Sequence, residues 1–150
     1  MKVDNKMRES VMEVFKLVGQ SIFSAQLMER ELEFLNILQE VDKNKELPTE
    51  EGMYEQAAIR LKRCTLGQLL DRSRKKSIVN EKILERLEKA LDKRNLLAHH
   101  FFCNRYGWFS NKSKHDIMKT ELVETRDMFK KIYDELYEES HRKLRDMVKI

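Results

Sequence analysis

Residues 11–38 of the chain read VMEVFKLVGQSIFSAQLMERELEFLNIL, and this stretch decides the fold class. Apolar residues recur in it every three or four positions, as they do along one face of an amphipathic α-helix. These positions are Val11, Phe15, Val18, Ile22, Ala25, Leu32, Leu35 and Leu38. The pattern predicts a long first helix that buries a single apolar face.

The rest of the chain contains few residues that interrupt helices. Its 150 residues include one proline and four glycines, and 37% of them are charged. A β-rich fold is disfavoured because it would need many turns. The length fits one core, so we expect a single domain over residues 1–150. The sequence predicts an all-α protein, an up-and-down four-helix bundle with long first and last helices and a jointed second helix.

Capping signals place the later helices. Thr49 suits the start of the second helix, and the capping box TLGQ at residues 65–68 restarts that helix after a joint. Asn80 is the expected cap of a third helix over residues 81–102. The fourth helix is expected from about Ser113 to the C-terminus. Its apolar positions are Ile117, Leu122, Phe129, Ile132, Leu136, Leu144 and Met147.

We expect a cytoplasmic protein that forms homodimers. No apolar run approaches the roughly 18 residues of a membrane span, and the N-terminus lacks the apolar core of a secretion signal. The last helix would be roughly 50 Å long, and an overhanging apolar stripe commonly pairs with a second copy. Cys64 and Cys103 are too few for a disulfide framework. They are interpreted as buried thiols, and no metal or cofactor is expected.

Basic residues concentrate between positions 60 and 76, where seven of them stand against one aspartate. Arg72, Arg74, Lys75 and Lys76 belong to this run and are candidates for contacts with an RNA backbone. A solvated helix face is the commoner explanation of such a run.

A second candidate RNA surface lies in the loop NRYGWFSNKSKH at residues 104–115. Arg105, Tyr106 and Trp108 combine charge with aromatic rings, which suits base stacking beside phosphate contacts. Aromatic residues at such a place more often fold back and seal the end of a bundle. Both interpretations stay open, and His115 is expected at the surface.

The third helix carries polar residues where its periodicity predicts core. Arg94 falls in the middle of the apolar arc, where a guanidinium needs an acid, a phosphate or water as its partner. Asn95 and His99 share one edge of the arc because they are four residues apart. His100 lies on the face expected to be solvated. The arc itself comprises Ile83, Leu84, Leu87, Ala90, Leu91, Ala98, Phe101 and Phe102.

This cluster has two interpretations, one catalytic and one structural. An imidazole can take the proton from a ribose 2′-hydroxyl while an arginine stabilises the charge that develops on the phosphate, and no metal is required. A buried arginine network is the structural alternative. Glu29 lies in the buried arc of the first helix and is the expected partner of Arg94, although it could also be an ordinary glutamate at the rim.

Arg94, Asn95 and His99, in the sequence RNLLAH, match the R-N-x-x-x-H form of the motif that marks the HEPN superfamily. The chain resembles uncharacterised bacterial HEPN-like proteins. The resemblance implies a four-helix bundle that dimerises so that the two motif helices face a shared cleft. It also implies a metal-independent endoribonuclease in which Arg94 and His99 are catalytic and Asn95 supports them. His100 fits the longer spacing of the motif, so either imidazole can be the base.

Active members of that superfamily are often toxins or antiviral abortive-infection effectors. The resemblance therefore implies RNA and an antitoxin or other regulatory protein as partners. HepT-type toxins carry a tyrosine two residues after the motif histidine, which a partner nucleotidyltransferase modifies, whereas this chain has Phe101 there. Inactive members serve as nucleotide-binding or protein-docking modules, so a noncatalytic dimeric adaptor is the alternative function.

Overall fold

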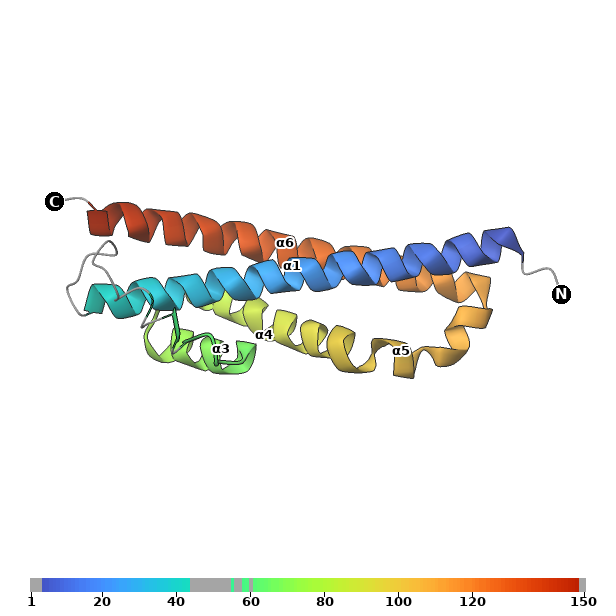
Figure 1. Ribbon diagram of the computed structural model, residues 1–150, viewed down its shortest axis with the longest axis horizontal. Helices are drawn as coiled ribbons and strands as arrows, with labels where there is room; N and C mark the ends of the chain where they lie inside the picture. The colour runs from blue at the N-terminus through green and yellow to red at the C-terminus, as the bar shows by residue number, and fades with distance from the viewer. Residues whose placement is uncertain (1–3, 44–54, 56–57, 60, 149–150) are drawn as a thin grey trace.

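The computed structural model describes residues 4–43, 55, 58–59 and 61–148. This part of the chain contains no strand, and four helices make up most of it (Figure 1). They are α1 (Asn5–Lys43), α3 (Leu66–Lys75), α4 (Glu81–Asn95) and α6 (Lys112–Val148). Three short segments join α4 to α6, namely the π-helix η1 (Leu96–His100), α5 (Phe101–Asn104) and the 3-10 helix η2 (Tyr106–Ser110). The predicted all-α bundle with long first and last helices is confirmed.

The joint predicted in the second helix lies at Thr65. Residue 61 is helical, residues 62–65 are not, and α3 begins at Leu66. Thr65 Oγ1 accepts a hydrogen bond from the backbone N–H of Gln68 at 3.2 Å, and Gln68 Oε1 accepts one from the N–H of Thr65 at 2.8 Å. These two bonds form the predicted capping box. The expected start of this helix near Thr49 lies outside the described residues.

Helices α1 and α6 lie side by side and run in the same direction (Figure 1). Their contacts advance together along both helices, from Ser10 with His115 to Glu31 with Ser140. Helix α4 runs antiparallel to both of them. The backbones of α1 and α6 approach closely at the fully buried Ser21, whose hydroxyl lies 3.2 Å from the carbonyl oxygen of Leu122.

The core is formed mainly by α1, α4 and α6. Most of the apolar residues predicted to face it on the two long helices are buried there, including Val18, Ala25, Leu32, Leu35, Leu38, Leu122, Phe129, Ile132 and Leu136. Phe15 and Ile117 were predicted to be buried, but they are 46% and 50% exposed. Their neighbours Val14 and Met118 are fully buried instead. The contact face is therefore rotated by about one residue at this end of the bundle.

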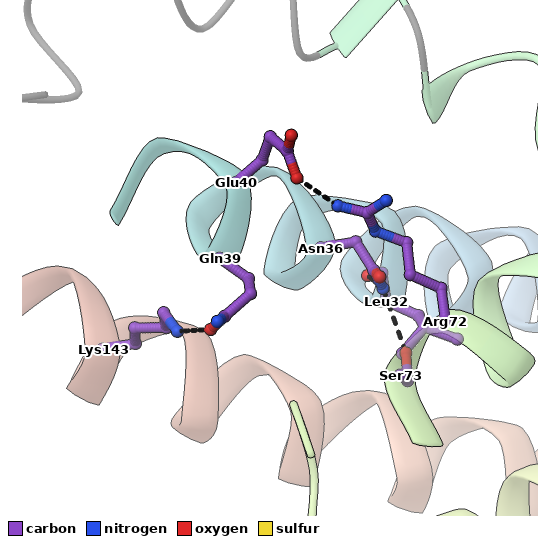
Figure 2. A network of polar contacts seen from close by, with 7 residues as sticks. All are labelled: Leu32, Asn36, Gln39, Glu40, Arg72, Ser73 and Lys143. Carbon is purple, nitrogen blue, oxygen red and sulfur yellow. Dashed lines mark hydrogen bonds and ion pairs between the residues drawn. The ribbon is translucent and has the colours of Figure 1, made fainter. Parts of the chain in front are cut away.

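Buried polar contacts dock α3 against α1 at the opposite end (Figure 2). Asn36 donates through Nδ2 to the carbonyl oxygen of Leu32 at 2.8 Å and to Ser73 Oγ at 3.0 Å. Arg72 and Glu40 form an ion pair beside this contact, as Figure 2 shows. Because Asn36 and Ser73 are fully buried, their hydrogen bond fixes the position of α3 more firmly than a surface pair would.

His115 is fully buried, so its predicted surface position is wrong. It shares a helical face with Met118 and therefore points into the bundle. Its Nε2 lies 2.8 Å from the carbonyl oxygen of Phe109 and its Nδ1 lies 3.0 Å from Ser10 Oγ. A carbonyl oxygen can only accept, so Nε2 carries a hydrogen and donates it to Phe109, while Nδ1 and the Ser10 hydroxyl form the second hydrogen bond. This one side chain links α1, η2 and α6.

Neither cysteine is fully buried. Cys64 is half-buried, whereas Cys103 is exposed, so the prediction of a buried thiol is wrong for Cys103. Within the described ranges, no helix combines the length and apolarity needed to cross a membrane.

Replacing His115 by alanine should lower the free energy of unfolding by roughly 2–4 kcal/mol, because the Phe109 carbonyl and the Ser10 hydroxyl lose a buried partner and a cavity is left. Urea unfolding followed by circular dichroism measures the change. The matched control is His141→Ala, since His141 is exposed and should alter the same quantity by less than about 0.5 kcal/mol. Equal stability of the two variants would contradict the buried link.

Candidate functional site

Helix α4 leads directly to the RNLLAHH segment at residues 94–100. Its cap is the predicted one, because Asn80 Oδ1 accepts a hydrogen bond from the backbone N–H of Ile83 at 2.9 Å. The helix was expected to continue without interruption to residue 102. Instead it ends at Asn95, and the next five residues form the π-helix η1. The motif is thus divided between the last turn of α4 and a π-turn.

The π-turn changes which side chains face the core. Leu97 is 7% exposed, whereas Ala98, predicted to be core, is exposed, and Phe102 is 39% exposed. A π-turn contains more residues than an α-turn, so it rotates side chains away from the positions that a regular helix gives them. Phe101 remains buried as predicted. The core assignments of Ala98 and Phe102 are therefore wrong.

Arg94 is held by a carboxylate from the first helix. Its Nε donates to Glu29 Oε1 at 2.6 Å, which confirms the predicted pair. Nη1 has a longer contact of 3.4 Å with Asn95 Oδ1. The Arg94 and Glu29 side chains are 34% and 23% exposed, so solvent screens the pair and its contribution to stability is small. The main effect of the pair is to orient the guanidinium. Since Glu29 binds Nε, hydrogens on both terminal nitrogens remain available to another group.

His99 and His100 are both exposed on the π-turn beside Arg94. Their ring centroids are 6.2 Å apart, and neither ring forms a hydrogen bond with a described residue. Asn95 is exposed as well. The two imidazoles can therefore reach solvent or a bound molecule, and the geometry favours neither of them as the base.

The surface beside Arg94 has a small hollow, and no larger cleft adjoins Arg94 among the described residues. The hollow has a volume of about 130 Å³ and lies between α1 and the start of the π-turn. It is lined by Ile22, Ala25, Gln26, Glu29, Arg94, Leu97 and Ala98. The histidines stand outside it. A substrate spanning Arg94 and an imidazole would therefore be exposed to solvent unless a second molecule covered it.

The predicted basic surface is partly neutralised. Arg74 pairs with Asp71 and Glu88, and Arg72 pairs with Glu40. Lys75 and Lys76, at the end of α3, are exposed. The two lysines are therefore the members of this run best placed to meet a phosphate.

The aromatic loop folds back onto the end of the bundle. Arg105, whose side chain is 11% exposed, binds Glu121 at 2.6 Å and stacks over the Phe101 ring at 4.5 Å. Trp108 is half-buried and packs against the core, with Lys114 above its ring at 4.8 Å. Tyr106 alone of the three candidate RNA contacts is largely exposed, at 86%. These contacts match the interpretation in which the loop seals the bundle.

A ring cluster that the sequence did not predict stands next to the motif. Phe15 of α1 lies against Phe102 at 5.4 Å and Phe109 at 5.9 Å between ring centroids. Phe15 and Phe102 are both well exposed. The apolar period of α1 signalled Phe15, but no local pattern indicated that its partners would come from the far side of the π-turn.

No protein-family model, no curated protein and no solved structure matches this chain. Among the described residues, no group of three or more histidine, cysteine or carboxylate side chains is arranged to hold a metal ion.

Replacing Glu29 by alanine should release Arg94. The Arg94 Nε–H should then exchange with solvent faster in nuclear magnetic resonance spectra, while the free energy of unfolding falls by less than about 1 kcal/mol because the pair is partly exposed. Glu85→Ala is the control, since Glu85 is an exposed carboxylate on α4. Unchanged exchange at Arg94 in the Glu29 variant would show that the carboxylate does not hold the guanidinium.

Proposed function

We propose that this protein is a metal-independent endoribonuclease of HEPN type, with its site in the RNLLAHH segment at residues 94–100 and completed by a second copy of the chain. One observation carries the proposal. A guanidinium oriented through Nε by Glu29 at 2.6 Å is followed, on the adjoining π-turn, by two exposed imidazoles that have no hydrogen-bond partner among the described residues. Cleavage of a phosphodiester needs a general base to take the proton of the attacking hydroxyl and a fixed positive charge to stabilise the phosphate.

The reaction needs two proton transfers and one stabilised charge. One imidazole, from His99 or His100, accepts the proton of the ribose 2′-hydroxyl as that oxygen attacks phosphorus. The bond from phosphorus to the 5′-oxygen then breaks, and the leaving oxygen takes a proton from a protonated imidazole or from water. The products are a 2′,3′-cyclic phosphate and a 5′-hydroxyl end. The terminal nitrogens of Arg94 hydrogen-bond the phosphate oxygens as negative charge grows on them.

A second copy supplies the enclosure that one chain lacks. The hollow beside Arg94 is small, and the histidines lie outside it on an open surface. The exposed rings of Phe15 and Phe102 adjoin the motif and give an apolar area that a dimer contact would cover. In such a dimer two motifs share one cleft, and water is excluded from the reacting groups. A role as a toxin or antiviral effector rests on the resemblance alone.

A noncatalytic dimeric adaptor is the second candidate. The observation that favours it is the absence of a deep cleft at Arg94 within the described residues, together with the ion pair that already satisfies Nε. In an adaptor the same exposed surface would dock a protein. Neither the parent nor variants at Arg94 or His99 would cleave RNA.

Incubation of the purified protein with single-stranded and structured RNA in EDTA tests the proposal. Cleavage leaving 2′,3′-cyclic phosphate ends is expected, and it should fall by about a hundredfold or more in Arg94→Ala and in the variant of whichever histidine is the base. His141→Ala is the control and should cleave like the parent. An intact RNA panel with folded, dimeric parent protein would favour the adaptor.

Mixing Arg94→Ala and His99→Ala protein tests whether the site combines residues from two copies. If Arg94 of one copy works with His99 of the other, random exchange of subunits should restore about a quarter of the parental activity, because half of the dimers are mixed and each has one intact site. If both residues act within one chain, mixing restores nothing.

A further inference from the structure

The hollow between α1 and the π-turn has walls of two kinds. Most of its lining is apolar and comes from Ile22, Ala25, Leu97 and Ala98. Its polar groups come from Gln26, Glu29 and Arg94. On α1 the lining residues recur at intervals of three and four, so they form one face of the helix. The opposite wall comes from the junction of α4 and η1.

The hollow is open because its small residues leave space. Alanine stands on both walls, at positions 25 and 98. A regular helix over residues 81–102 would place Ala98 in the core, but the π-turn leaves it exposed at the edge of the hollow. A π-turn of this kind is uncommon inside helices and is found frequently at functional sites.

The polar groups of the hollow are not equivalent. Glu29 is engaged with Arg94 at 2.6 Å. Gln26 lies one helical turn before Glu29, and its exposed amide makes no hydrogen bond with a described residue. An amide both donates and accepts, so it can recognise a ring edge that carries a donor beside an acceptor. The hollow thus offers apolar walls for the faces of a flat ring and one free amide for its edge.

The volume of about 130 Å³ limits the ligand. It is well above the roughly 30 Å³ of one water molecule in the liquid and below the roughly 300 Å³ of a typical small-ligand pocket. A single planar ring system fits this range, whereas a complete nucleotide does not. The sugar and phosphate of such a ligand would lie outside the hollow, where the terminal nitrogens of Arg94 are available.

We propose that this hollow is a nucleobase subsite of the ribonuclease, in which Gln26 reads the edge of one base next to the scissile phosphate. The substrate class rests on the proposed function, since the hollow and the reacting groups share Arg94. Gln26 is then a specificity-determining residue. It sets which nucleotide is preferred at the cleavage position, and the histidines carry out the proton transfers for any base.

The test measures binding without cleavage. Protein labelled with ¹³C at alanine methyl groups is titrated with four 2′-deoxy homodinucleotides, one for each base, which lack the attacking hydroxyl. The Ala25 and Ala98 methyl resonances should shift on binding, with one base preferred. Gln26→Ala should lower the affinity for the preferred dinucleotide by about tenfold and reduce the difference between bases. Ala98→Leu should fill the hollow and abolish the shift at Ala25.

Gln20→Ala is the matched control. Gln20 is also a glutamine on α1, but it lines the groove between α1 and α6 and accepts from Arg126. This variant should bind the dinucleotides like the parent. The inference is overturned if neither alanine methyl responds to any dinucleotide, or if the response and its base preference persist unchanged in Gln26→Ala and Ala98→Leu.

Cleavage of RNA by the parent is scored separately, so the two proposals can fail independently. A protein that cleaves RNA while the alanine methyls stay silent keeps the proposed function and loses the base subsite. If the protein cleaves no RNA but its methyl shifts depend on Gln26, the hollow binds a base and the proposed ribonuclease function is wrong.

Discussion

The packing of α1 along α6 is the constraint on which the site depends. Ser21 is fully buried at this contact, with its hydroxyl 3.2 Å from the carbonyl oxygen of Leu122. Because the serine side chain is small, the two backbones can approach closely. With one side of α1 committed to α6, its neighbouring face is left to meet the π-turn η1 and Arg94 in the last turn of α4. That face carries Glu29, and Glu29 orients Arg94. The position of the guanidinium is therefore set by long-range helix packing and only secondarily by the motif itself.

The π-turn η1 is the second feature that determines the geometry of the site. Its five residues include both motif histidines, and it interrupts a helix whose capping and apolar period give no sign of an interruption. A regular helix would have placed Ala98 in the core and His99 on one edge with Asn95. The observed turn exposes Ala98, leaves Leu97 in the core, and presents two imidazoles to solvent. Leu97 and Phe101 are buried on this segment and pack it against the core.

Features governed by local rules could be predicted from the sequence. The capping box at Thr65, the cap at Asn80 and much of the buried stripe of α1 follow from short-range patterns that depend on few neighbours. The Glu29 and Arg94 pair could also be anticipated, because each charge falls on an apolar arc and needs a partner. The site residues themselves are predictable only as a cluster, since their accessibility depends on the π-turn.

The remaining features depend on tertiary contacts that no local pattern shows. His115 lies in the first turn of α6, where a histidine is usually solvated. It is buried because Ser10 comes to it from the start of α1, while Phe109 of η2 folds back onto it. Arg105 was a candidate RNA contact, but Glu121 and the Phe101 ring hold it against the bundle. In each case a charged or polar residue found a partner across the fold that the sequence does not place near it.

The most direct test of this account is a crystal structure of the protein with an RNA whose 2′-hydroxyl at the cleavage position is methylated. We predict a phosphate bound by the terminal nitrogens of Arg94, with Glu29 still on Nε, and the imidazole of His99 or His100 within hydrogen-bond reach of the blocked 2′-oxygen. A complex in which the RNA lies elsewhere, with Arg94 bound by Glu29 and by no phosphate, would contradict the assignment of this surface as the site of cleavage.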